Sequence, residues 1–211
     1  MTSPSKIDFK KTDKHLYKPS AKKPAILEVP DLPYLMIDGQ GAPQGQVFQQ
    51  AVKALYTLAY KIRMSHKSGH APADYFEYVV PPLEGIWDII PGTVYDPRDK
   101  TNFKWTLMIR QPDFVTPDFV EKMRSIAQAV DDNPSLSAVR FDRQTDGLVC
   151  QMLHMGPFDD EPATFARMEA WAEEEGYRRQ SKIHREIYLS DFNRTAPEKL
   201  KTVLRFKVEK R

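Results

Sequence analysis

The sequence predicts an α+β fold built from two strand-helix-strand-strand units in a pseudo-two-fold arrangement. Stretches in which apolar and polar residues alternate indicate strands, and stretches with apolar residues three and four positions apart indicate helices. These stretches follow one another as strand, helix, strand, strand in the first half, and the same order returns from Leu148 onward. Such a duplication places two small sheets side by side, with helices covering one face.

The first half opens with two extended segments and a turn at residues 38–45 that is rich in glycine. A helical period follows, because Phe48, Leu55 and Ile62 belong to one apolar stripe. The clearest strand is 103–110, where large apolar residues occupy every second position. The predicted elements of this half are strands at 25–29 and 34–37, a helix at 46–64, and strands at 74–80, 83–89 and 103–110.

The second half repeats this order after an intervening helix at 116–130. That helix is predicted to begin at Thr116-Pro117, a favourable N-cap and first helical residue. The predicted elements that follow are a strand at 148–155, a helix that opens near Asp160 and ends before Gly176, an extended segment at 182–189, and a strand at 202–208.

We expect a basic lead-in at residues 1–23 and one domain at residues 24–211, with duplicated units at about 24–110 and 145–211. The lead-in carries seven lysines against two aspartates. We expect it to pack apolar side chains such as Leu16 on the domain. Contact with nucleic acid or an acidic surface is the alternative.

Composition excludes several classes of protein. Of the 211 residues, 41% are hydrophobic, which is enough for a core and excludes a wholly disordered chain. A net charge of +2 argues against a dedicated nucleic-acid binder. The single cysteine, Cys150, excludes a disulfide framework. No apolar run approaches about 18 residues and the N-terminus lacks a signal-peptide core, so we expect a soluble, cytoplasmic protein without a membrane partner.

Glu186 is the strongest candidate for chemistry. Strand alternation places His184, Glu186 and Tyr188 on one side and Arg185 and Ile187 on the other. We expect the Ile187 side to pack under the helix, so that Glu186 projects onto an open face. A carboxylate among apolar neighbours can serve as a general base or as an anchor for a cationic aromatic ligand. The alternative is an exposed strand glutamate that pairs with a lysine.

Glu84 is the second candidate, because it matches Glu186 in the proposed repeat. Each glutamate follows the helix of its unit and precedes the final strand. Two equivalent glutamates would face one another across the axis, which suggests a supporting catalytic role for Glu84.

The sequence contains more aromatic residues than the apolar stripes of the helices need for the core. Such residues are typical of a cleft for flat, hydrophobic or cationic molecules. Their alternative role is in the core. Met152 and His154 share one face of the strand at 148–155. The candidate ligand-binding residues are Trp87, Tyr188, Tyr56, Tyr60, Tyr78, Met152 and His154. The five histidines lack ligand spacing, and no phosphate-binding loop is present, so we expect neither a metal nor a cofactor.

Six segments, in order, resemble the GyrI-like small-molecule-binding domain, in its stand-alone branch without a DNA-binding domain. They are residues 34–41, 54–60, 80–87, 105–115 and 156–163, and 186–191 taken with 200–205. The resemblance implies a central ligand cleft between the two units. It also implies that Glu186 corresponds to the buried glutamate that meets cationic drugs in this fold. Phe192 stands where relatives often carry proline, and we expect it to lie outside the cleft.

The resemblance further implies a reaction. Some stand-alone relatives are cyclopropanoid cyclopropyl hydrolases, which open the cyclopropane of DNA-alkylating antibiotics of the yatakemycin type by adding water. On this sequence Glu186 would activate the water, with Trp87 and Tyr188 holding the planar ligand. The leading hypothesis is therefore a xenobiotic-binding protein with cyclopropane hydrolase activity. The alternatives are a binding module that sequesters or senses ligands without chemistry, and a protein that interacts with DNA gyrase.

Overall fold

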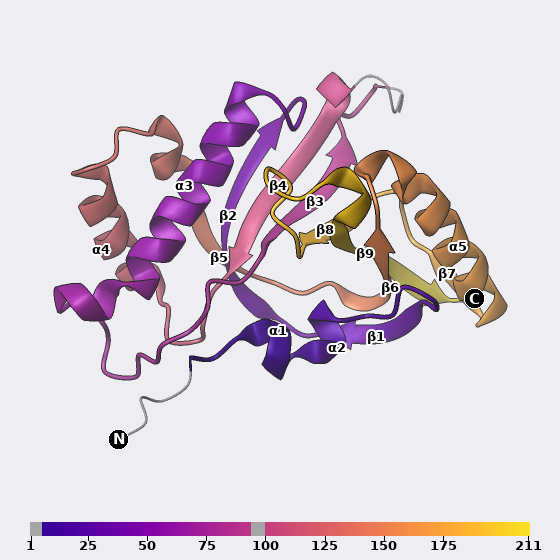
Figure 1. The fold of residues 1–211 in the computed structure, drawn as a ribbon, viewed down its shortest axis with the longest axis horizontal. Helices are drawn as coiled ribbons and strands as arrows, with labels where there is room; N and C mark the ends of the chain where they lie inside the picture. Colours follow the sequence, from indigo (N-terminus) through magenta and orange to yellow (C-terminus); the bar gives the residue numbers. More distant parts are fainter. Residues whose placement is uncertain (1–5, 94–99) are drawn as a thin grey trace. The chain divides into compact units, whose positions relative to one another are not determined.

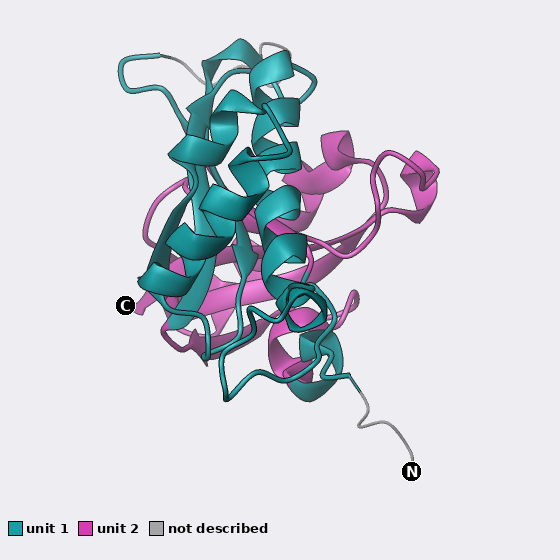
Figure 2. Ribbon diagram, turned by 90° about the vertical axis from the view of Figure 1, so that its left-hand side faces the viewer, with its two compact units in different colours: residues 1–12, 32–81, 89–144 teal, residues 13–31, 82–88, 145–211 magenta. Residues whose placement is uncertain are grey.

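The computed structural model describes residues 6–93 and 100–211. Its strands pair antiparallel and its helices pack on the strands, which confirms the predicted α+β class. The chain divides into two compact units, coloured separately in Figure 2. The first unit contains residues 1–12, 32–81 and 89–144, and the second contains 13–31, 82–88 and 145–211. The two units are described in turn.

In the first unit, β2 (Leu32–Gln40) lies between β4 (Phe103–Arg110) and β5 (Arg140–Gln144). Helix α3 (Gln46–Arg63) packs on β2 and β4 and also contacts α4 (Pro117–Gln128) (Figure 1). Most of the apolar stripe predicted for α3 is buried, because that stripe faces the sheet.

Residues 74–80, predicted as a strand, form a loop whose ladder contact is a single bridge between Tyr78 and Ile7. Prolines flank the segment, and a proline cannot donate to a strand ladder. Side chains hold the loop instead, as the Tyr75 hydroxyl donates to the carbonyl of Arg63 at 2.6 Å. Aromatic and β-branched composition therefore predicted a strand where no partner strand is available among the described residues.

In the second unit, the strands run in the order β1-β6-β9-β8-β3, and β7 pairs with β9. Helix α5 (Glu161–Glu174) packs on β6 and β7 (Figure 1). The strands are β1 (Ala25–Val29), β3 (Leu83–Ile89), β6 (Gly147–Met155), β7 (Tyr177–Arg179), β8 (His184–Tyr188) and β9 (Lys201–Lys210). The short helices of the chain are α1 (Phe9–Thr12), α2 (Lys14–Tyr17), and 3-10 turns at Ser65–Ser68, Lys100–Asn102, Pro134–Ala138, Phe158–Asp160 and Pro197–Lys199.

The compact units differ from the boundaries that chain order suggests, 24–110 and 145–211. Strands β1 and β3 come from the first half of the chain, but they pair with β6 and β8 of the second unit. Chain order identifies the strands, whereas backbone hydrogen bonding between distant segments decides which strands share a sheet.

Helix α5 covers the face of the second unit's sheet that carries Glu186. Directly opposed residues of antiparallel strands share a face, and Leu204 pairs with both Met152 and Glu186. Met152 and Leu204 pack in an apolar cluster with Met168 of α5. The prediction that this helix covers the Ile187 side, leaving the Glu186 side open, is therefore wrong. The alternation itself is confirmed, but it could not show which side a helix would cover.

The opposite face is covered by the N-terminal segment. Gln151 donates from Nε2 to the carbonyl of His15 at 2.5 Å, and Arg205 donates from Nη2 to the carbonyl of Leu16 at 3.2 Å. Leu16 and Tyr17 are buried. Residues 1–5 of the predicted lead-in lie outside the described residues. Within residues 6–93 and 100–211, no helix is both long and apolar enough to cross a membrane.

Close packing in the first unit depends on one glycine. Gly39 on β2 is directly opposite Trp105 on β4. A Cβ atom at Gly39 would overlap the Trp105 ring. The ring is fixed, since it is buried, meets Phe48 edge-on at 5.2 Å, and donates to the carbonyl of Gly41 at 3.2 Å.

We therefore expect Gly39→Ala to lower the free energy of unfolding by about 2 kcal/mol, because the ring must move out of its packed position. Chemical denaturation measures this cost. In a Trp105→Leu background the added methyl group has room, so the same substitution should cost about 1 kcal/mol less. An equal cost in both backgrounds would show that the Trp105 ring is not the obstacle.

Candidate functional site

Three predicted site residues form a hydrogen-bonded chain in the second unit. Trp87 on β3 donates from Nε1 to the Tyr188 hydroxyl at 2.8 Å, and that hydroxyl donates to Oε2 of Glu186 at 2.8 Å. The register of β3 and β8 sets Gly85 opposite Glu186 and Trp87 opposite His184, so these side chains share a face. Glu186 is 8% exposed and Tyr188 is 9% exposed. The structure thus places the Glu186 carboxylate inside the protein.

His184 contacts the second oxygen of the same carboxylate. Its Nε2 lies 3.1 Å from Oε1 of Glu186, and its Nδ1 lies 3.2 Å from the carbonyl oxygen of Lys182. The ring of Phe165, on α5, meets the imidazole edge-to-face at 4.7 Å. Both carboxylate oxygens of Glu186 therefore have a polar partner, and a helix side chain fixes the orientation of the imidazole.

The Tyr188 phenol remains protonated. Burial raises the pKa of Tyr188 well above its ordinary value, and the charge and hydrogen bond of Glu186 raise it further. Because the phenol oxygen accepts the Trp87 N–H, its own proton is directed at Glu186. The two hydrogen bonds are therefore donated in one direction, from Trp87 to Tyr188 and from Tyr188 to the carboxylate of Glu186.

Glu84 lies on the opposite face of the sheet. Its cross-strand partner is Ile187, which points away from Glu186 because successive strand residues alternate. Oε2 of Glu84 accepts a hydrogen bond from Nη1 of Arg185 at 2.8 Å, and the side chain is buried. The prediction that the two glutamates face one another is therefore wrong. The register is offset by one residue from the one that would pair them, and this offset turns Glu84 to the other side.

Glu84 belongs instead to a buried ionic network. Arg185 also donates from Nη2 to Asp146 at 2.8 Å, and Arg205 donates from Nη1 to the other oxygen of Asp146 at 3.1 Å. Burial raises the pKa of Asp146, but the charges of Arg185 and Arg205 outweigh it and hold the pKa below its ordinary value. Two carboxylates thus balance two guanidinium groups, which is the arrangement that buried charges require.

Met152 and His154 share a face of β6, as the strand period predicts. Met152 is buried in the cluster beneath α5. Nδ1 of His154 lies 2.9 Å from the Thr164 hydroxyl, and Nε2 lies 3.0 Å from the carbonyl of Pro157. Both side chains are therefore engaged with α5 and the turn before it. Their role as ligand contacts stays a prediction.

The three other predicted tyrosines belong to the first unit. On α3, the rings of Tyr56 and Tyr60 lie 6.2 Å apart, and Tyr60 is 52% exposed. Tyr78 is buried, with its ring 6.0 Å from that of Phe114, and burial raises its pKa far above the ordinary value. Glu186 belongs to the second unit, so the role of these tyrosines as ligand contacts also stays a prediction.

Sequence reasoning missed two aromatic side chains beside Tyr188. Phe158 meets the Tyr188 ring edge-on at 5.9 Å, and Phe192 meets it at 5.7 Å. The two phenylalanine rings also contact each other, at 6.4 Å. That Phe192 lies outside the ligand cleft stays a prediction, and its ring packs against the tyrosine that donates to Glu186. No local pattern places residues 158 and 192 together, because they belong to separate turns.

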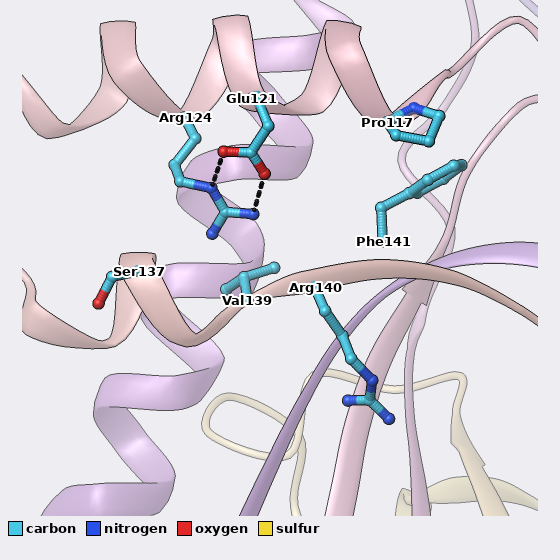
Figure 3. Close-up of a pocket in the computed structure, with 7 residues that line it drawn as sticks. All are labelled: Pro117, Glu121, Arg124, Ser137, Val139, Arg140 and Phe141. Carbon is cyan, nitrogen blue, oxygen red and sulfur yellow. Dashed lines mark hydrogen bonds and ion pairs between the residues drawn. The ribbon is translucent and has the colours of Figure 1, made fainter.

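A pocket of about 440 Å³ lies in the first unit, and sequence reasoning did not predict it (Figure 3). It is lined by Pro117, Glu121, Arg124, Ser137, Val139, Arg140 and Phe141. Arg124 donates to both carboxylate oxygens of Glu121, at 3.1 and 2.9 Å, and to the carbonyl of Leu136. Arg140 donates to Asp38 at 2.9 Å. Both guanidinium groups of this pocket are therefore already engaged by the protein.

Comparison with known proteins identifies the family. Residues 22–209 match the model of the GyrI-like small molecule binding domain. The chain belongs to the GyrI-like family. This assignment confirms the resemblance inferred from the sequence, and with it the GyrI-like fold. No match was found among the curated proteins.

Two solved structures are similar to this GyrI-like chain over almost its whole length. An uncharacterized conserved protein from Listeria innocua shares 42% identity at a TM-score of 0.90, covering 97% of this chain and 100% of that chain. A hydrolase from Listeria innocua shares 41% identity at a TM-score of 0.87, with the same coverage. The C-terminal domain of EcmrR, at 14% identity and a TM-score of 0.52, covers 90% of this chain and 98% of its own, and shares the fold alone.

The arrangement around Glu186 suits two kinds of chemistry. An ionised carboxylate held on both oxygens can accept a proton from water or face a positive charge. Among residues 6–93 and 100–211, no group of three or more His, Cys, Asp or Glu side chains is placed to hold a metal ion.

The ionic network gives a stability prediction. We expect Asp146→Asn to lower the free energy of unfolding by about 3 kcal/mol at neutral pH, because two buried guanidinium groups lose their anionic partner. The native pKa of Asp146 is depressed, so its stabilisation is fully present above the ordinary aspartate pKa and is lost as the pH falls through the native value. The difference between wild type and variant should therefore shrink in acid. Urea unfolding at a series of pH values measures it.

The matched control is Glu209→Gln. Glu209 pairs with Arg178 at 2.7 Å on the exposed surface of the same unit, so its loss should cost at most about 1 kcal/mol. If the cost of Asp146→Asn did not change with pH, the carboxylate charge would not be its cause.

Proposed function

We propose that this GyrI-like protein binds planar hydrophobic or cationic xenobiotics beside Glu186 and hydrolyses the cyclopropane of cyclopropanoid DNA-alkylating antibiotics. The observation that carries the proposal is the buried Glu186 carboxylate, held by Tyr188 and His184 among aromatic rings. The 41% identity to a Listeria innocua hydrolase supports a hydrolytic reaction. Interaction with DNA gyrase stays a prediction from the resemblance.

The reaction needs one base and an oriented ligand. Glu186 removes a proton from water, and the water oxygen forms a bond to the cyclopropane carbon. The strained carbon–carbon bond breaks, and its electron pair moves into the conjugated dienone to give a phenolate. The phenolate then takes up a proton, so the sum is the addition of one water molecule. Because ring strain and the dienone already activate the substrate, orientation and a carboxylate base are sufficient.

Tyr188 and Trp87 act on the carboxylate in this scheme. The proton of Tyr188 is donated to Glu186, and its oxygen accepts the hydrogen bond from Trp87. Both residues therefore orient the base, while their rings contribute aromatic surface. A carboxylate fixed by two donors keeps its remaining lone pairs in a defined direction for water.

Binding without chemistry is a second function that the same observation favours. An anionic oxygen beside aromatic rings attracts flat cations through charge and cation–π contacts. A protein that sequesters such ligands would bind them tightly and release them unchanged. Mass spectrometry of the ligand after incubation separates this function from hydrolysis.

We expect Glu186→Gln to reduce the rate of ring opening of a cyclopropane alkylator by about 10²–10⁴-fold, because the amide cannot accept the proton of water. Mass spectrometry of the water adduct over time measures the rate. Glu174→Gln, at an exposed position on α5, is the control and should retain the wild-type rate. Equal, slow water addition by wild type and Glu186→Gln would remove the catalytic role and leave binding as the function.

We expect Tyr188→Phe to lower kcat about tenfold with a smaller change in KM, because the ring stays in place while Oε2 of Glu186 loses its donor. The free energy of unfolding should fall by about 1–3 kcal/mol, since two buried polar groups lose a partner. Steady-state kinetics and urea unfolding measure the two effects. Trp87→Phe removes the donor to Tyr188 and should have the smaller kinetic effect. An unchanged kcat in Tyr188→Phe would contradict the orienting role.

A further inference from the structure

His184 contacts the Glu186 carboxylate directly and is the contacting side chain that can carry a positive charge. Tyr188 is held neutral by its raised pKa, and Trp87 and Phe165 carry no charge. The imidazole lies within hydrogen-bond distance of the carboxylate, and its side chain is 23% exposed, so it can exchange protons with solvent. Histidine is the side chain that changes charge near neutral pH.

The cationic groups near the imidazole are each paired with a carboxylate. Arg179 lies 5.1 Å over the Phe165 ring and pairs with Glu169 at 2.6 Å. Lys182 pairs with the same Glu169 at 3.1 Å. Arg185 is engaged on the opposite face of the sheet. Glu161 of α5 acts electrostatically on Tyr188, so it adds negative charge to this side of the sheet.

Each ring nitrogen of His184 faces a hydrogen-bond acceptor, so each contact needs its own N–H. Nδ1 faces the carbonyl oxygen of Lys182 and Nε2 faces the carboxylate of Glu186, and both of these groups are acceptors. A neutral imidazole carries one N–H and can satisfy one acceptor, whereas an imidazolium satisfies both. The observed geometry therefore suits a protonated His184 beside an ionised Glu186, a pair with no net charge.

We propose that His184 determines which ligand charge the site accepts. The protonated imidazole neutralises Glu186, and this state favours neutral planar ligands. The deprotonated imidazole leaves the carboxylate charge unopposed, and this state favours planar cations. The inference rests on ligand binding at Glu186, as proposed above, and is independent of hydrolysis.

The physical reason is competition between two cations for one anion. A ligand cation near Oε1 of Glu186 would stand beside the imidazolium, and like charges a few ångströms apart repel in a poorly solvated site. Loss of the His184 proton removes this repulsion, and the ligand cation is then attracted by the uncompensated charge of Glu186. A neutral ligand of the same shape experiences neither effect, so its affinity should not follow the protonation of His184.

The test compares N-methylquinolinium, a permanent planar cation, with its neutral isostere 1-methylnaphthalene, by fluorescence titration. For the wild-type protein, we expect the affinity for the cation to rise about tenfold between about pH 5.5 and pH 8, and the affinity for the isostere to stay constant. In His184→Phe, which keeps an aromatic ring against Phe165, the affinity for the cation should lose its pH dependence. His184→Gln, which keeps a neutral donor to Glu186, should behave in the same way.

Several outcomes would overturn the proposal. They are a flat wild-type profile, no cation binding at any pH, equal pH dependence for both probes, or a pH dependence that survives in both His184 variants. The last would assign the effect to Glu186 itself. Hydrolysis is scored separately with a cyclopropane alkylator. Loss of cation selectivity in the variants without any wild-type hydrolysis would support the role of His184 and reject the proposed reaction.

Discussion

A carboxylate is stable inside a protein only where donors replace the water that it loses, and this constraint governs the second unit. Glu186 meets it through Tyr188 on one oxygen and His184 on the other. The donors come from its own strand, and Trp87, which orients Tyr188, comes from β3. The pairing of β3 with β8 is therefore a condition of the site. Without this pairing, the Tyr188 hydroxyl would lose the hydrogen bond that it accepts from Trp87. The Glu186 carboxylate would then no longer be held in one orientation.

Successive residues of β8 point to opposite faces of the sheet, so Arg185 and Glu186 lie on different faces. One face carries Arg185, whose partners Glu84 and Asp146 are buried with it and balance its charge. The other face carries Glu186, whose partners are a phenol and an imidazole. A shift of one residue in register would exchange these faces and leave charges without partners, so the ionic network specifies the register on which the site depends. The charges of the ionic network and the carboxylate of Glu186 are thus adjacent in sequence but do not share contacts.

The family assignment identifies the fold, whereas the chemistry of the site depends on the side chains that the fold carries. The GyrI-like match and the Listeria innocua structures establish the fold, and the family match supports small-molecule binding. A fold of this kind does not specify a reaction, because chemistry depends on the side chains placed on it. Here those side chains are the buried carboxylate of Glu186, its two polar partners, and aromatic rings that include the unanticipated Phe158 and Phe192. Phe192 shows how a residue outside any motif can support the centre of a site.

Much of the fold could be predicted from local patterns. Helix α3 and strand β4 were predicted within a residue of their observed bounds, because their apolar periods are long and regular. Residues 74–80 show the limit of such patterns, since strand-like composition does not form a strand without a partner. The grouping of Glu186 with Tyr188 and His184 was also predictable, as alternation within one strand is a local property.

The sequence by itself determined the class of fold, the order of elements and the candidate base, because these follow from spacing along the chain. Only the tertiary structure decided that β1 and β3 join the second unit, that α5 covers the Glu186 face, and that Glu84 pairs with Arg185. Each of these depends on contacts between residues far apart in sequence. The free energy of such contacts is set by burial and hydrogen bonding in the folded protein, and no local pattern records it.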